Sequence, residues 1–163
     1  FRMADFPVVC ANYDVSATVL KDLVKPYVVF ERDGVKIGVL GLGCQLEGMV
    51  QANKCVGVVY NDPVTVANEV AAVLKEKEGC DVVVCLSHLG VQYDENQLIP
   101  KTRNIDVVLG GHSHTFMKGP KTLLNMDGKN VSLMHTGKYI PDAFFYTVKV
   151  SSPSYPPDVR LQS

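Results

Sequence analysis

Two continuous apolar runs of strand length limit the fold more than any other part of the sequence. Residues 81–86 (DVVVCL) and 105–109 (IDVVL) do not alternate polar and apolar side chains. Such runs are typical of strands that other layers cover on both faces. Residues 62–79, before the first run, have a helical pattern, and residues 96–101, between the runs, also suit a short helix. Helix, strand, short helix and strand in this order predict a βαβ unit with parallel strands.

The predicted helix at residues 62–79 has its own start and stop signals. Asp62 suits the N-cap, Pro63 suits the first helical position, and Gly79 suits the stop. Apolar side chains recur at the spacing of one helix face: Val66, Val70, Val73 and Leu74. We therefore expect one helix whose apolar face carries these four side chains.

Antiparallel elements are predicted on both sides of this unit. Residues 27–31 and 35–40 flank an Asp-Gly pair, which is among the stronger short-range hairpin signals. Residues 7–11 resemble a short buried strand. Near the other end, residues 131–135 and 144–150 are predicted to be strands of antiparallel character.

The chain is expected to form one α/β domain over residues 1–150, because 163 residues are too few for two well-cored domains. Residues 41–61 are rich in Gly, Gln and Asn and predict a long loop with little strand. Residues 151–163 contain three prolines and no periodic apolar pattern, so they are predicted to be a linker or tail.

Composition and charge exclude several classes of partner and site. The formal net charge is −1, and Lys and Arg form no run, so we expect no nucleic-acid partner. No apolar stretch reaches the roughly 18 residues of a membrane span. The five cysteines are odd in number and include no Cys-x-x-Cys pair, which argues against a disulfide framework or a thiolate zinc site.

Three of the four histidines directly follow the two predicted parallel strands. His88 lies in residues 86–90 (LSHLG), and His112 and His114 lie in residues 110–115 (GGHSHT). Ligands of α/β sheets gather at the carboxyl ends of strands, and neutral imidazole is the commonest protein ligand of metals. The two glycines before His112 allow a sharp turn and a close backbone approach to an ion. The three histidines therefore predict a metal site, although any one of them alone would more often be a hydrogen-bonded structural residue.

Other polar residues near these histidines are interpreted as structural. His135 lies within a strand-like run without a partner close in sequence. Asp94 and Glu95 could orient metal ligands, but solvated loop charges are the preferred interpretation. Ser87, beside His88, is not interpreted as a nucleophile, because the Gly-x-Ser-x-Gly pattern is absent.

The two histidine segments resemble the last two motifs of the calcineurin-like metallophosphoesterases. They are most similar to the branch with 5′-nucleotidases, UDP-sugar hydrolases and 2′,3′-cyclic phosphodiesterases. Residues 6–12 (FPVVCAN) resemble the strand after that family's Asn-His motif, and residues 26–42 resemble its hairpin and the strand that leads out of it. The likeness covers about residues 5–150 and implies part of a layered α/β/β/α sandwich, with the N-terminal half of that domain missing here.

The resemblance also implies chemistry at two metal ions. His88 and His112 would bind one divalent ion and His114 the other, and imidazole and oxygen ligands suit Mn, Zn, Fe or Co. Paired ions clamp a phosphoryl group and lower the pKa of a bound water that attacks in line. The implied function is hydrolysis of a phosphate ester, foremost a nucleotide, by a full-length protein in the periplasm or outside the cell.

The chain departs from the family pattern in its upstream ligands. No Asp-x-His occurs, and Asn12 is not followed by histidine. The bridging carboxylate and the transition-state histidine are therefore expected upstream of Phe1, and no catalytic residue is visible in this chain. We expect the isolated chain to be inactive, a substrate domain to follow it, and a homo-oligomer to cover unpaired sheet edges if it folds alone.

Three hypotheses remain open on the sequence. The chain is half of an enzyme whose other ligands lie upstream, or a non-catalytic domain that binds a metal or another ligand through the three histidines. The third hypothesis is a purely structural α/β domain whose histidines satisfy local hydrogen bonds.

Overall fold

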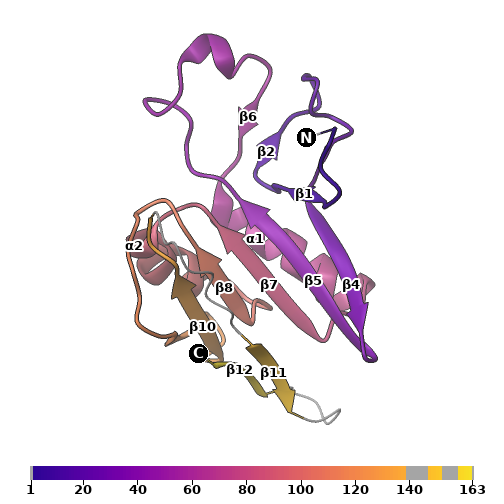
Figure 1. Ribbon diagram of the computed structural model, residues 1–163, viewed down its shortest axis with the longest axis vertical. Helices are drawn as coiled ribbons and strands as arrows, with labels where there is room; N and C mark the ends of the chain where they lie inside the picture. Colours follow the sequence, from indigo (N-terminus) through magenta and orange to yellow (C-terminus); the bar gives the residue numbers. More distant parts are fainter. Residues whose placement is uncertain (1, 139–146, 152–157, 163) are drawn as a thin grey trace.

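The computed structural model describes residues 2–138, 147–151 and 158–162, and a six-stranded mixed sheet forms its centre (Figure 1). The strand order is β4-β5-β7-β8-β10-β9. The bounds are Tyr27–Arg32 for β4, Val35–Leu42 for β5, Val82–Ser87 for β7, Val107–Gly110 for β8, Asn130–His135 for β10 and Lys121–Leu124 for β9. Strands β5, β7, β8 and β10 are parallel, and β4 and β9 are antiparallel to their neighbours.

The predicted hairpin and the predicted parallel pair are confirmed. Strands β4 and β5 join through Asp33 and Gly34, which have φ angles of 52° and 77°. Two consecutive positive φ values match the right-handed twist of the flanking strands, which is why an Asp-Gly pair favours this turn. Strands β7 and β8 pair in parallel, as the order of predicted helices and strands indicated.

The antiparallel prediction for residues 131–135 is wrong for one of their two neighbours. Strand β10 pairs in parallel with β8 and antiparallel with β9, a strand that the sequence did not predict. Strand β9 lies at the sheet edge with three of its four side chains exposed, so its sequence (KTLL) carries no clear alternation. Strand β10 has an interior position, and all but its first residue are buried.

Helix α1 (Pro63–Ala72) begins as predicted. Its N-cap carboxylate, Asp62, accepts a hydrogen bond of 2.8 Å from the Thr65 N–H. The helix continues as a wider-turned segment, η2 (Val73–Lys77), and Gly79, with a φ of 67°, follows it. A left-handed residue at a helix end is a common stop, and glycine adopts it without strain.

The buried face of this helix is shifted from the predicted one. The predicted Leu74 is fully buried together with Ala67 and Ala71, whereas the predicted Val66, Val70 and Val73 are half-buried. Alanine lets the helix lie close to the sheet, so the central contact line carries small side chains and the valines flank it. The second helical stretch begins earlier than predicted, as α2 (Val91–Tyr93), η3 (Asp94–Leu98) and η4 (Ile99–Lys101).

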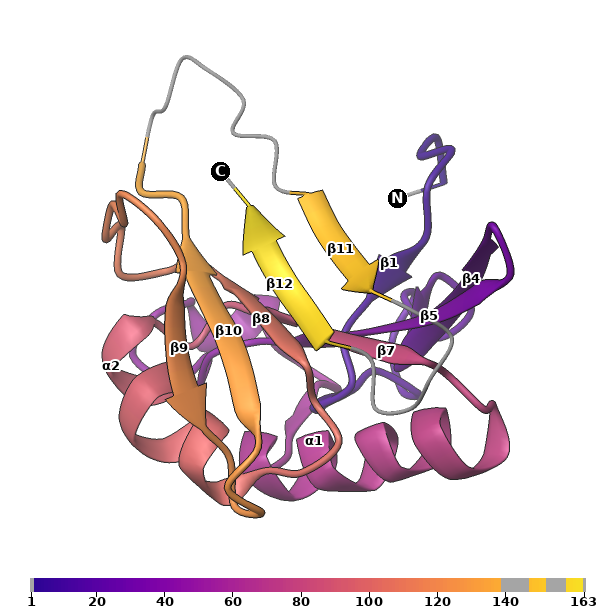
Figure 2. The ribbon, with the colours of Figure 1, turned by 90° about the horizontal axis from the view of Figure 1, so that it is seen from below.

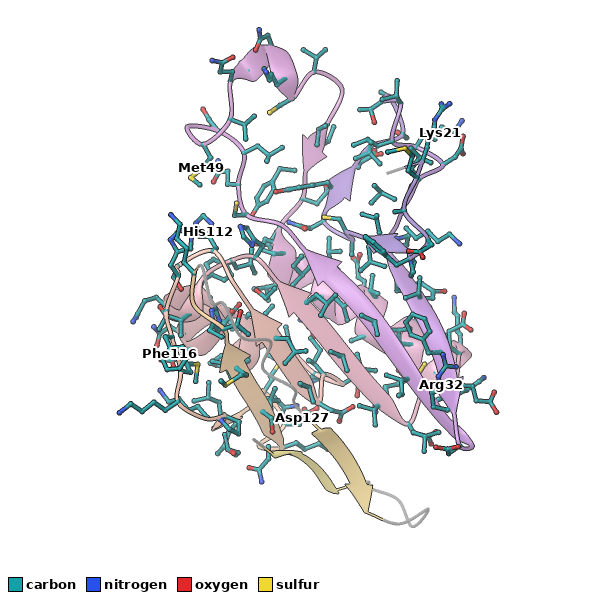
Figure 3. All side chains as sticks on the ribbon, viewed as in Figure 1. Lys21, Arg32, Met49, His112, Phe116 and Asp127 are labelled. Carbon is teal, nitrogen blue, oxygen red and sulfur yellow. The ribbon has the colours of Figure 1, made fainter. Side chains whose placement is uncertain are left out.

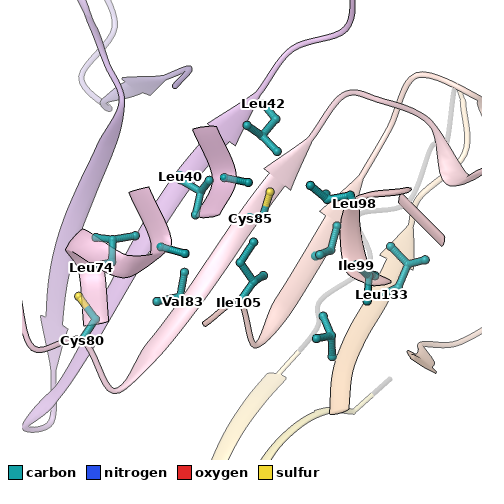
Figure 4. Close-up of a cluster of buried hydrophobic side chains, with 14 residues drawn as sticks. Leu40, Leu42, Leu74, Cys80, Val83, Cys85, Leu98, Ile99, Ile105 and Leu133 are labelled. Carbon is teal, nitrogen blue, oxygen red and sulfur yellow. The ribbon is translucent and has the colours of Figure 1, made fainter. Parts of the chain in front are cut away.

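The main core lies between the sheet and these helices. Figure 4 shows Leu40, Cys85 and Leu133 from three strands of the sheet in this cluster, with Leu98 and Ile99 from the second helical stretch. Figure 2 shows α1 and α2 on one side of the sheet and strands β11 and β12 on the other. A second cluster of buried side chains (Val82, Val84, Val107 and Met134) occupies that other face. The helices therefore cover one face of the sheet, and β11 and β12 lie against part of the other, where Leu86 of β7 stays 41% exposed.

Short elements before α1 lie beyond the carboxyl end of β5 (Figure 1). They are β1 (Val8–Val9), β2 (Tyr13–Asp14), β3 (Val24–Lys25), η1 (Ala52–Lys54) and β6 (Val59–Tyr60). Strand β1 is half-buried and shorter than the predicted run at residues 7–11, and it pairs with β3. Asn12 is fully buried, and its side-chain amide makes two hydrogen bonds of 2.8 Å to the backbone of Gly43, which fasten this region to the sheet.

Residues 151–163, predicted to be a linker or tail, include a strand. Strand β12 (Asp158–Gln162) pairs antiparallel with β11 (Thr147–Ser151). Part of the predicted strand at residues 144–150 lies outside the described residues. No helix in the described part of the chain has the length and apolarity to cross a membrane.

Candidate metal centre

The fold brings the histidine segments together at the carboxyl edge of the sheet. Strands β7 and β8 are parallel neighbours, and Ser87 at the end of one pairs in register with Gly110 at the end of the other. His88 and His112 follow within two residues, and their ring centroids lie 5.1 Å apart in an edge-to-face arrangement of 70°. Figure 3 shows His112 at this edge of the sheet, whereas Arg32, the last residue of β4, lies far away at the opposite edge.

The electrostatics of the site favour the neutral form of His88. The pKa of His88 is lowered from its ordinary value, first by partial burial and then by the nearby His112 and His114. A second positive charge close to the first is unfavourable, so protonation of one ring opposes protonation of its neighbours. Neutral imidazole is the form that binds metal ions, so the lowered pKa keeps His88 in the ligand form near neutral pH.

The backbone of the second histidine segment is held in an unusual conformation. His112 and His114 have φ angles of 73° and 55°, in the left-handed region that non-glycine residues seldom adopt. Hydrogen bonds support the segment, because the Ser113 hydroxyl accepts from the Val91 N–H at 3.1 Å and lies 3.0 Å from the Thr115 hydroxyl. Residues in such conformations cluster at functional sites, where the surrounding structure holds the strained backbone in place.

The glycine before His112 is needed for close packing. A Cβ on Gly111 would lie 3.2 Å from His88 Nδ1, closer than an ordinary contact. A side chain at this position would therefore push His88 away from the segment that carries His112. The Gly-Gly pair, noted in the sequence for turn freedom, acts here by allowing the two histidine segments to approach each other.

The histidines meet only part of the needs of a two-metal site. His88 and His112 are in ring contact, and His114 is near enough to influence the pKa of His88. Across residues 2–138 and the two described strands that follow, no group of three or more His, Cys, Asp or Glu side chains is placed to hold a metal ion. Among the described residues, the three histidines therefore supply only part of the ligands that two divalent ions need.

A buried polar network lies beneath the site. Asp94 is fully buried, and its two carboxylate oxygens contact the Ser87 hydroxyl at 2.6 Å and His135 Nε2 at 2.8 Å. The prediction that Asp94 is a solvated loop charge is therefore wrong. Glu95 also lies in the helical segment η3, where its side chain is 21% exposed and forms an ion pair with Lys121 at 2.9 Å.

One sequence signal could have revealed the burial of Asp94. Asp94 lies four residues before Leu98 on the same helix face, and Leu98 is fully buried. The structural interpretation of His135 agrees with its 1% exposure. Its partner, however, lies 41 positions away in the sequence, where no local pattern could indicate it.

A crevice of about 480 Å³ opens beside the histidines at the ends of β5, β7 and β8. It is lined by Val9, Cys10, Tyr13, Leu42, Gly43, Leu86, Ser87, His88, Leu109, Gly110 and Gly111. The Tyr13 hydroxyl donates to the Cys44 carbonyl oxygen. The crevice places His88 at a mainly apolar opening, at the edge where α/β sheets bind ligands.

Comparison with known proteins relates most of the chain to nucleotide phosphoesterases. No protein-family model matches the chain. A 5′-nucleotidase of Vibrio cholerae is 32% identical over 132 residues, which are 72% of this chain and 24% of that protein. The crystal structure of a 5′-nucleotidase precursor from Thermus thermophilus has a TM-score of 0.75 and 31% identity, covering 82% of this chain and 28% of that one. The calcineurin-like phosphoesterase YfkN of Bacillus subtilis has a TM-score of 0.59 and 30% identity, covering 69% and 38%.

Sequence and fold together relate the chain to the phosphoesterases. More narrowly, the proteins that it resembles are calcineurin-like phosphoesterases and 5′-nucleotidases. It spans about a quarter of the length of the Vibrio cholerae and Thermus thermophilus proteins. The chain is thus one part of the architecture that these relatives possess.

Proposed function

We propose that the protein containing this chain hydrolyses the phosphate ester of a nucleotide in a metal-dependent reaction. His88, His112 and His114 would serve as metal ligands. The observation that carries this proposal is the convergence of both histidine segments at one sheet edge, in a chain whose relatives include 5′-nucleotidases. Bonds from metal to imidazole nitrogen are about 2.0–2.1 Å long, so two rings 5.1 Å apart can bind one ion together.

The rest of the machinery would come from other segments of the full-length protein. Two divalent ions (Mn, Zn, Fe or Co) would supply Lewis-acid stabilisation of the phosphoryl group and a nucleophilic water. A preceding segment would contribute the bridging carboxylate and the transition-state histidine, and a following domain would hold the substrate. A preceding segment would also cover the apolar crevice beside His88, and we expect this chain to form a homo-oligomer if it folds alone.

We also propose a periplasmic or extracellular location for this protein. The support is the relationship to the Thermus thermophilus 5′-nucleotidase, which is described as a precursor. Fractionation of cells that express the natural full-length protein would test the location directly.

The decisive experiment measures phosphate release from AMP by the full-length protein with added Mn²⁺. Removing a direct ligand by His88→Asn or His112→Asn should lower kcat/KM by more than the roughly 10–100-fold typical of residues that only support ligands. Glu69→Gln, on the exposed side of α1, is the control and should retain full activity. Full activity in both histidine variants would refute the proposed ligands. Metal binding by the wild type without any turnover would favour the alternative of a non-catalytic binding domain.

A further inference from the structure

The buried network of Ser87, Asp94 and His135 connects the two strand ends that carry the histidine segments. Ser87 is the last residue of β7, directly before His88, and its hydroxyl also accepts from the Leu89 N–H at 3.2 Å. His135 is the last residue of β10, and its register partner on β8 is Gly110, just before Gly111 and His112. Asp94 lies between them, in the helical stretch after β7.

The order of the three groups excludes a nucleophilic role for Ser87. The Ser87 hydroxyl donates to one carboxylate oxygen of Asp94, and His135 Nε2 lies 2.8 Å from the other. The imidazole does not contact the hydroxyl that it would have to deprotonate in a hydrolytic triad. The network therefore holds groups in place and does not activate one of them.

The position of His135 depends on this network and on tight packing. Its exposure is 1%, and in the described part of the chain its Nδ1 is buried with no hydrogen-bond partner. Its polar anchor is thus the 2.8 Å contact to Asp94. A Cβ on Gly110 would overlap the His135 ring, so the ring fills the space under the end of β8. A movement of this ring would shift the end of β8 and the segment after it, which carries His112.

We propose that Asp94 and His135 are positioning residues that set the separation of His88 and His112. Asp94 holds the His88 side through Ser87, and it holds the His112 side through His135 and the packed Gly110. This inference rests on the proposed function in one respect only, namely that the two positioned rings serve as metal ligands. The positioning itself is a property of the metal-free protein.

The first test measures the ring contact without metal, by NMR of the full-length protein with labelled histidines. His135→Gln keeps a side-chain group that can hydrogen-bond to Asp94, whereas His135→Leu removes that group and keeps an apolar side chain. We expect His135→Leu to abolish the nuclear Overhauser contact and ring-current shift between His88 and His112, and His135→Gln to retain them.

A matched control separates positioning from general loss of stability. Asp106→Asn alters a carboxylate that accepts from Lys75 Nζ at 2.9 Å and from the Val83 N–H at 2.7 Å, at the other end of the same strands. It should lower the Tm yet preserve the ring contact of His88 and His112. An intact contact in His135→Leu, or an equal loss of contact in Asp106→Asn, would overturn the inference.

The second test measures the affinity of the full-length protein for Co²⁺ by its visible absorption. His135→Leu should weaken the Kd by about 10–100-fold, while His135→Gln and Asp106→Asn remain within about twofold of wild type. An unchanged Kd in His135→Leu would contradict the positioning role. If the wild type binds no metal, the proposed function fails, and the metal-free NMR comparison still decides whether Asp94 and His135 position the rings.

Discussion

Replacing Asp94 with alanine should be far more damaging than replacing the adjacent Glu95. Asp94 is fully buried, accepts a hydrogen bond of 2.6 Å from Ser87 and contacts His135 Nε2 at 2.8 Å. Hydrogen bonds to charged groups contribute about 1.5–3 kcal/mol each, and removing one partner of a buried pair typically costs about 3–5 kcal/mol. The loss also leaves His135 buried without a polar partner. We therefore expect Asp94→Ala to lower the free energy of unfolding by about 3–5 kcal/mol.

Glu95→Ala is the matched comparison, because Glu95 forms a partly exposed ion pair with Lys121. Exposed pairs contribute about 0–1 kcal/mol, so this variant should be almost neutral. Urea unfolding followed by circular dichroism measures both changes, and the Tm of Asp94→Ala should fall by roughly 6–20 °C in a domain of this size. If the two variants lose the same free energy of unfolding to within about 1 kcal/mol, burial and hydrogen bonding do not distinguish Asp94 from Glu95.

Three further predictions follow from local features. His112→Ala should raise the pKa of His88, because it removes a neighbouring ring whose charge opposes protonation, and NMR titration of the His88 ring would detect the change. A pKa of His88 in His112→Ala that is equal to or below the wild-type value would contradict this prediction. Since the pKa of His88 is lowered in the folded protein, its contribution to stability is present above its unfolded pKa, near 6.5, and is lost as the pH falls below that value. Asp62→Ala should lower the free energy of unfolding by about 1 kcal/mol by removing the N-cap bond to the Thr65 N–H, and Asp62→Asn should retain most of it; equal losses in urea unfolding would show that the cap is not responsible. Complete burial raises the pKa of the Cys85 thiol, so native Cys85 should react with iodoacetamide only at the rate of unfolding; immediate modification seen by mass spectrometry would show that this core opens.

Local sequence signals predicted the elements whose cause is local. The hairpin at Asp33 and Gly34 depends on the φ angles that those two residues can adopt, and the start of α1 depends on the Asp62 carboxylate. The continuous apolar runs at β7 and β8 predicted strands buried on both faces, because a strand between two layers has no solvent-facing side. The metal-site prediction followed from the histidines at the ends of these strands and from the likeness of their segments to a known family.

Other features could not be predicted because partners distant in the sequence cause them. The burial of β10 does not indicate which strand it pairs with, so its parallel pairing with β8 could not be predicted. Strand β9 lacks a pattern because its edge position exposes most of its side chains. The face of α1 that is buried carries Ala67 and Ala71, one position after the predicted Val66 and Val70. The small alanine side chains allow the helix to lie close to the sheet.

By itself, the sequence determined the βαβ unit, the tight hairpin and the presence of histidines after adjacent strands. Those properties depend on backbone preferences and on apolar spacing, and both act over a few residues. Only the tertiary structure decided that His88 and His112 lie in ring contact and that Asp94 and His135, 41 positions apart, meet beneath them. A buried carboxylate is stable only where the fold supplies donors, and those donors come from β7 and β10, which meet Asp94 only after the sheet and helices have packed.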